Sequence, residues 1–173
     1  MFPGVTPLEP TAASLRQSRM RQITQEDSDK VARLVAEAAR LPLSDAAFAL
    51  WRERYRLDEW EGRMPPSSEQ VAAFRAMTLE QQAAKYRHDR DHAHEGPMFA
   101  LVKRACPRAS DADIRQAIAE AVKFEDATFK YFKWDGDFWD CVVRAVAQAQ
   151  ARHPGYLDMT YRDARDNLAY YMK

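Results

Sequence analysis

Residues 110–134, SDADIRQAIAEAVKFEDATFKYFKW, predict the longest helix of the chain. Apolar side chains recur in this segment at intervals of three and four residues, which places them on one face of a helix. Ser110 is followed three residues later by Asp113, a pattern that is typical of a helix N-terminus. Glycine is also scarce, with 5 among 173 residues, and the sequence has no Asn-Gly or Gly-Gly pair to signal a hairpin. The chain therefore predicts an all-α fold.

Capping residues followed by periodic apolar residues predict about seven or eight short helices in total. The expected ranges are 24 or 28 to 41, 44–60, 67 or 68 to 77, 78–95, 98–106, 110–134, 135 or 137 to 153, and 160–173. We expect these helices to pack as an irregular bundle. Residues 24–173 then form a single helical domain, and residues 1–23 form an extended, polar N-terminal arm.

The helix predicted over 44–60 is apolar on two sides, since successive residues are turned by about 100°. One side carries Phe48, Trp51 and Tyr55, and the other carries Ala46, Leu50 and Leu57. The last helix likewise has Tyr171 on one side and Tyr170 on the other. Such helices are expected to pack on two sides, and one of these sides is a candidate contact with another protein.

The composition indicates a soluble, intracellular protein without a membrane span. Lys and Arg number 26 and Asp and Glu number 26, so the formal net charge is zero. A nucleic-acid-binding protein usually has a basic excess, and we expect no such partner. The sequence has no apolar run of about 18 residues and no secretory signal. Cys106 and Cys141 stand apart among apolar neighbours, which predicts buried, reduced thiols.

The N-terminal arm is basic, because it carries Arg16, Arg19 and Arg21 and Glu9 is its sole acid. Three interpretations remain open for these arginines: a solvated tail, a contact with a partner subunit, or a patch that binds nucleic acid. We favour a protein partner over nucleic acid because of the neutral total charge. An acid-poor arm with several arginines also fits an organellar, mitochondrial assembly.

Four potential metal ligands share one face of the helix predicted over 78–95. They are His88, Asp91, His92 and Glu95, at positions i, i+3, i+4 and i+7. Two imidazoles with flanking carboxylates can hold a transition metal. The opposite side of this helix is apolar and is expected to be buried; it carries Leu79, Ala83, Tyr86 and Ala93. The four ligands would then face water, whereas a catalytic metal normally lies in a supported cleft. We therefore predict a solvated face or ordinary ion pairs, with a contact with a partner and metal binding as the alternatives.

Glu125 is an acid on the apolar stripe of the longest helix. A buried carboxylate must find a partner or take up a proton. We expect a buried pair with an arginine or a tyrosine hydroxyl, and the alternatives are a functional acid or a contact with another subunit. A lone carboxylate is weak support for acid–base catalysis, which usually needs a second positioned group.

Residues 129–140, FKYFKWDGDFWD, gather aromatic side chains at a predicted corner between two helices. They point in several directions, so we do not expect all of them to fill one core. Core packing is the favoured interpretation, and the alternative is that Tyr131 and Trp134 are contacts with a partner, since aromatic residues are enriched at interfaces.

The sequence contains no nucleophile elbow, phosphate-binding glycine loop or dinucleotide fingerprint. We accordingly expect no catalytic and no cofactor-binding residues. The function that we predict is a non-enzymatic protein-interaction role, as an accessory or structural subunit of a larger assembly, with a homo-oligomer as a further option. The alternative is a small helical metal-binding protein or metal-dependent enzyme that uses His88 and His92.

Overall fold

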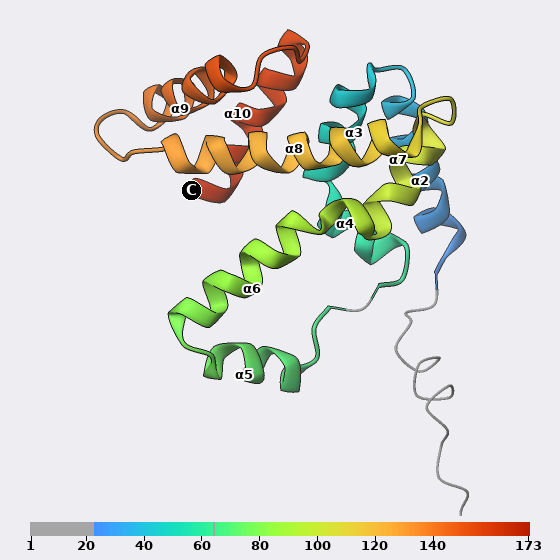
Figure 1. Cartoon of the computed structure of the whole chain (residues 1–173), viewed down its shortest axis with the longest axis horizontal. Coiled ribbons are helices and arrows are strands. Elements are labelled where there is room, and N and C mark those ends of the chain that lie inside the picture. The colour runs from blue at the N-terminus through green and yellow to red at the C-terminus, as the bar shows by residue number, and fades with distance from the viewer. Residues whose placement is uncertain (1–22, 64) are drawn as a thin grey trace, which may run out of the picture.

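The computed structural model describes residues 23–63 and 65–173. This part of the chain contains nine α-helices, one short 3-10 helix and no strand, so the all-α prediction is confirmed. In chain order the elements are α2 (Gln25–Ala38), α3 (Leu43–Arg52), α4 (Arg54–Trp60), α5 (Ser68–Ala76), α6 (Leu79–Asp91), η1 (Ala93–Glu95), α7 (Pro97–Ala105), α8 (Asp111–Tyr131), α9 (Phe138–Arg152) and α10 (Asp158–Met172) (Figure 1).

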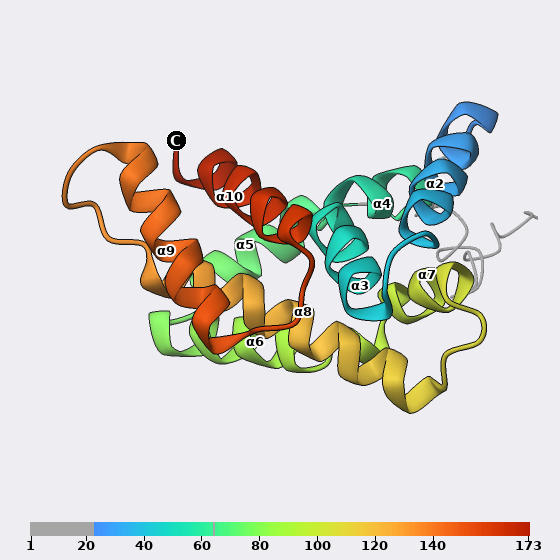
Figure 2. The same cartoon turned by 90° about the horizontal axis from the view of Figure 1, so that it is seen from above.

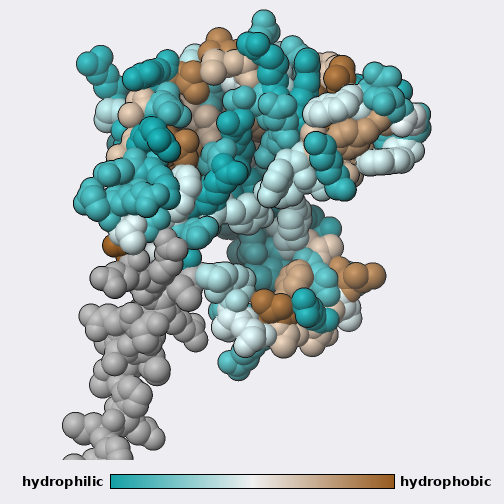
Figure 3. Space-filling view, turned by 180° about the vertical axis from the view of Figure 1, so that it is seen from behind, coloured by the Kyte–Doolittle hydropathy of each residue, from teal (hydrophilic) through white to brown (hydrophobic). Residues whose placement is uncertain are grey.

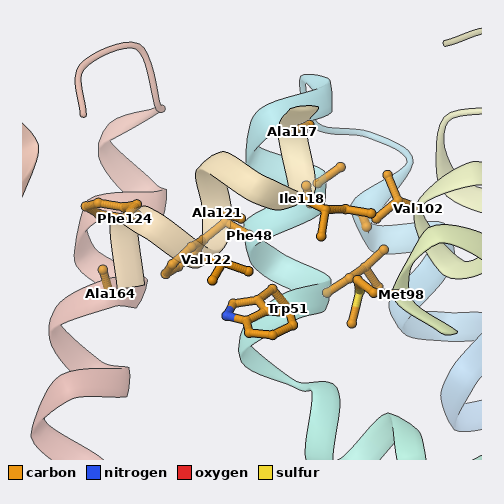
Figure 4. Packing of buried hydrophobic residues seen from close by; sticks show 14 of the residues in the cluster. Phe48, Trp51, Met98, Val102, Ala117, Ile118, Ala121, Val122, Phe124 and Ala164 are labelled. Carbon is orange, nitrogen blue, oxygen red and sulfur yellow. The ribbon is translucent and has the colours of Figure 1, made fainter. Parts of the chain in front are cut away.

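Helix α8 crosses the main body of the molecule, which is formed by α2–α4 and α7–α10, and its residues lie at the centre of the core (Figures 1 and 4). The Ser110 hydroxyl caps it by accepting a hydrogen bond from the Asp113 amide at 3.1 Å. Its apolar face contacts α3, α7, α9 and α10. Ile114, Ile118 and Phe124 on this face are fully buried. Because its apolar residues are covered from several directions, α8 determines where the other helices pack.

Residues 44–60 form two helices instead of the single helix that was predicted. The helix is interrupted at Glu53, whose φ of −92° and ψ of 7° depart from helical values. Both apolar sides of α3 are covered by the chain itself, since Phe48 and Leu50 are each 1% exposed and Trp51 is 7% exposed. The two-sided pattern of α3 therefore reflects a central helix, and these positions are not free for a partner protein.

A polar contact joins the first turn of α3 to the first turn of α10. Asp45 is 1% exposed and accepts hydrogen bonds from the Leu157 amide at 2.8 Å and the Thr160 hydroxyl at 2.6 Å. Leu157 is the N-cap residue of α10 and has no side-chain acceptor. Asp45 therefore accepts a hydrogen bond from a backbone amide that would otherwise lack a partner at the N-terminus of α10, although Asp45 is distant along the chain. Figure 2 shows α10 between α9 and α3, both of which it contacts.

Residues 65–91, called the lobe below, project from the body (Figures 1 and 3). They contain α5 and α6, which begin with capping boxes at Ser67 and Thr78. Every residue of both helices is at least partly exposed. The prediction of a buried side on α6 is wrong, because Leu79 is 84% exposed and Tyr86 is 54% exposed. The physical reason is that α6 is held near its C-terminal end by the charged side chain of Arg90 instead of by an apolar stripe.

Candidate functional site

The histidine cluster does not lie on one continuous helix face. Helix α6 ends at Asp91, His92 is its C-cap residue, and Glu95 lies in η1. The His88 and His92 rings stack at a centroid distance of 4.1 Å, and His92 Nδ1 lies 2.8 Å from the His88 carbonyl oxygen. In this geometry, His92 Nδ1 donates a hydrogen bond to one of the last carbonyl groups of the helix. This nitrogen is then not available to bind a metal ion.

The carboxylates of this region are also spread apart. Asp91 and Glu95 are exposed, and Glu95 is near His94 (3.7 Å) rather than His88 or His92. Within residues 23–63 and 65–173, no group of three or more His, Cys, Asp or Glu side chains is placed to hold a metal ion. The 3-10 turn after Asp91 is the local cause, since it changes the helical period on which the four-residue face depended.

Glu125 is 1% exposed and joins four segments of the fold. Its carboxylate accepts four hydrogen bonds, from Trp51 Nε1 at 2.8 Å, Arg54 at 3.0 Å, Arg90 at 2.8 Å and Asn167 at 3.0 Å. Oε2 accepts the hydrogen bonds from Trp51 and Arg90, and Oε1 accepts those from Arg54 and Asn167. The donors come from α3, α4, α6 and α10, so this one side chain connects the body with the lobe.

The charge state of Glu125 follows from its neighbours. Burial alone would raise the pKa of this carboxyl, but the nearby Arg54 and Arg90 guanidinium groups outweigh burial and lower the pKa. Glu125 is therefore ionised at neutral pH. All four of its acceptor directions are used by protein donors, so it has no free position from which to accept a substrate proton. This geometry is that of a structural ion cluster and not of a general base.

Asp126 lies beside this cluster and behaves differently. Arg90 also contacts its carboxylate at 2.6 Å. Burial raises the pKa of Asp126 in spite of Arg90, because the ionised Glu125 nearby also disfavours a second negative charge. Arg90 thus bridges two acids of α8, which explains how a single side chain can hold the end of α6.

The corner between α8 and α9 exposes two tryptophans. Trp134 is 66% exposed and Trp139 is 49% exposed. The Trp134 ring contacts Phe132 and Phe138, each at a centroid distance of 5.6 Å, and Phe138 contacts Trp139 at 5.4 Å. We call these four residues the aromatic corner. Tyr131, the other predicted contact, is half-buried at the end of α8.

Turn and cap geometry holds the aromatic corner in place. Helix α8 stops at Tyr131, and Gly136 has a φ of +150°, a value that side-chain-bearing residues rarely adopt. The Asp137 carboxylate then caps α9 by accepting from the amides of Trp139 and Asp140. Asp135 forms an ion pair with Arg144 of α9. The helix cap and the ion pair therefore fix the backbone that carries the exposed Trp134 and Trp139 side chains.

A second exposed aromatic group was not predicted as a site. Tyr55 of α4 and Tyr170 and Tyr171 of α10 line a cleft of about 520 Å³ between these helices. They are 62%, 74% and 43% exposed, respectively. The sequence placed Tyr170 and Tyr171 on different sides of one helix, but it gave no sign that Tyr55 would face them, because that proximity depends on the packing of α3, α4 and α10.

Arg16, Arg19 and Arg21, the remaining predicted partner contacts, lie outside the described residues. None of the described helices is long and apolar enough to cross a membrane. No model of a known protein family matches the chain, and no curated protein or solved structure shows significant similarity to it. Statements about function therefore depend on the surfaces described above.

Proposed function

We propose that the chain is a non-enzymatic interaction protein that acts as an accessory or structural subunit of a larger intracellular assembly. The observation that carries this proposal is the aromatic corner. A tryptophan that is 66% exposed leaves a large apolar area in water. Trp134 and Trp139 are connected through the Phe138 ring, which contacts both. Apolar groups that are exposed together in this way mark interaction sites on soluble proteins.

The aromatic corner has two properties of an interface hot spot. Tryptophan is the residue type most enriched at positions that dominate binding energy. The two tryptophans are also held by edge contacts to Phe132 and Phe138, at 5.6 and 5.4 Å, so little side-chain freedom is lost on binding. A partner with an apolar pocket for Trp134 would thus gain more from this corner than from an equal area of mobile side chains.

The polar groups of the body support the same proposal. Glu125, one of two acids that are only 1% exposed, has its hydrogen-bonding positions filled by protein donors. Cys141 is buried and Cys106 is half-buried, and both are free thiols, which is usual for proteins of reducing compartments. A mitochondrial assembly is one setting that would suit such a chain with Arg16, Arg19 and Arg21 in its arm.

The test is affinity purification of the tagged full-length chain and of two variants from the native cells, with quantitative mass spectrometry. Trp134→Ser removes the exposed ring, and Tyr170→Ser is the matched control, since Tyr170 is similarly exposed (74%) on α10. We expect a defined set of proteins in stoichiometric amounts with the wild type and the control. Trp134→Ser should lose them by tenfold or more, a loss that corresponds to about 1.4 kcal/mol.

Two results would contradict the proposal. Recovery of the folded wild-type chain alone would exclude a stable subunit role. Equal recovery of partners by Trp134→Ser and wild type would show that the aromatic corner is not the contact surface. Reconstitution with each separately purified partner would then establish which contacts are direct.

A further inference from the structure

The lobe does not stabilise itself by burial. Helix α5 has 9 residues and α6 has 13, and isolated helices below about 12–15 residues are marginal in water. Their capping boxes at Ser67 and Thr78 stabilise the N-terminal ends, but every side chain of both helices remains at least partly exposed. A further surface that covers α5 and α6 would therefore stabilise them.

The lobe contains an apolar hollow. A groove of about 720 Å³ lies between α5 and α6, and Val71, Phe74 and Met77 form its apolar lining. Phe74 is 38% exposed, and Val71 and Met77 are half-buried. Figure 3 shows hydrophobic patches on this part of the molecule, below the body. The groove is wide enough to accept several apolar side chains of a partner.

The lobe also contains an apolar projection next to that hollow. Leu79, the first residue of α6, is 84% exposed, which is the highest value among the large apolar side chains described. A two-fold contact between identical chains requires a surface that is complementary to itself. The lobe offers both parts of such a surface, because the projection at Leu79 and the groove lie on the same two helices.

The charges around the groove also suit a second copy. Lys85 and Asp89 line it together and form an ion pair at 2.9 Å, and Arg75 lies on the α5 side. Both signs are thus present at one rim, so Lys85 of one chain can face Asp89 of another without net repulsion. A strongly acidic or basic partner would find no such match, and the formal net charge of the whole chain is zero.

We propose that two copies of this chain associate lobe to lobe, with Leu79 of each chain in the groove of the other. This contact is separate from the aromatic corner and does not depend on the function proposed for that corner. Helices of 9 and 13 residues are about 14 and 20 Å long and about 10 Å wide, so one face spans on the order of 340 Å² in projection. Stable interfaces bury about 800 Å² per partner. The dimer is accordingly expected to be weak and transient.

The test is sedimentation equilibrium of the full-length chain from about 1 to about 200 µM, a range that brackets a micromolar dissociation constant. The mass of the wild type should rise from 19.9 kDa toward twice that value. Leu79→Glu should stay at 19.9 kDa throughout, because it places a charge in an apolar groove. Tyr170→Ser and Trp134→Ser change other exposed side chains (74% and 66%) outside the lobe and should behave as wild type.

A second measurement keeps the result from depending on one variant. Amide hydrogen exchange of α5 should slow as the concentration rises, and it should slow by more than exchange of α8 in the core. A wild type that remains monomeric at the highest concentration would overturn the proposal. So would Leu79→Glu dimerising as the wild type does, because the dimer would then use another surface. If the wild type does not self-associate but still captures partners through Trp134, only this inference is refuted. If it self-associates but captures no partners through Trp134, only the proposed function is refuted.

Discussion

Replacing Glu125 with Gln tests whether the buried ion cluster holds the fold together. Gln has nearly the same shape as Glu, but it is neutral and one of its two terminal atoms is an NH₂ group. Each oxygen of Glu125 accepts two hydrogen bonds in the native structure. Whichever way the amide turns, its NH₂ group would face two other donors, and Arg54 and Arg90 would lose their buried counter-charge.

The expected effect is large. Hydrogen bonds to charged groups contribute about 1.5–3 kcal/mol each, so two lost bonds correspond to about 3–6 kcal/mol. Breaking a buried ion pair by removing one partner costs about 3–5 kcal/mol, which agrees with this range. We therefore expect Glu125→Gln to lower the free energy of unfolding by about 4 kcal/mol, and the melting temperature by about 8–16 °C for a chain of this size.

Urea unfolding followed by circular dichroism measures this change at neutral pH. Glu120→Gln is the matched control, since Glu120 lies on the same helix but its side chain is 37% exposed and pairs with Lys123. That control should change the free energy of unfolding by less than about 1 kcal/mol. Because the low-pKa carboxylate is the reason for the effect, the double variant Glu125→Gln/Arg90→Met should lose less than the sum of the single changes.

If the free energy of unfolding of Glu125→Gln lies within about 1 kcal/mol of the wild-type value, as for an ordinary partly exposed acid, the ion cluster does not hold the fold together. Additive losses in the double variant would also contradict the prediction. Strict additivity would mean that Glu125 and Arg90 contribute independently and that the four-donor cluster is not a connected unit.

The other predictions concern pH, the lobe, a helix end and the histidines. The pKa of Glu125 is lowered from its ordinary value of 4.5. The contribution of Glu125 to the free energy of unfolding should therefore be complete above pH 4.5 and be lost as the pH falls through the folded-state pKa. In acid titrations, the stabilities of wild type and Glu125→Gln should converge below this folded-state pKa. Arg90→Met should speed hydrogen exchange in α6 while leaving α8 protected, because Arg90 ties the lobe to the body. Asp45→Ala should lower the free energy of unfolding by about 2 kcal/mol, since it leaves two donors unpaired. Simultaneous His88→Ala and His92→Ala should change stability by less than about 0.5 kcal/mol with or without added Zn²⁺ in thermal melts.

Local sequence signals located most of the helices. Four helices are capped by residues that were their expected starts or one of two alternative starts: Thr24, Ser67, Thr78 and Ser110. Such starts can be predicted because a cap is an interaction across three or four residues. The break at Glu53 was not predicted, since neither glycine nor proline marks it. It arises where the chain turns from α3 toward α4 and places Arg54 against Glu125.

The surroundings of Glu125 could be predicted only in part. Its place on an apolar stripe indicated burial and a cationic partner, but the actual donors lie 35 to 74 residues away along the chain. Nothing local distinguishes Arg54 and Arg90 from the other arginines, or indicates that Trp51 would turn its indole N–H toward an acid. Such long-range polar contacts are fixed by the packing of several helices at once, and helical periodicity carries no information about them.

Helix α6 shows the same limit more sharply. Its sequence has a recognisable apolar side, and periodicity alone assigned that side to the core. In the structure the guanidinium of Arg90 enters the body, and the apolar side of α6 is left in water. Because Arg90 connects the lobe to Glu125, any contact that orders α6 also favours the native ion cluster, by the usual linkage between binding and folding. The proposed self-association through the lobe would therefore be coupled to the stability of the core through one arginine, and replacing Glu125 should weaken both.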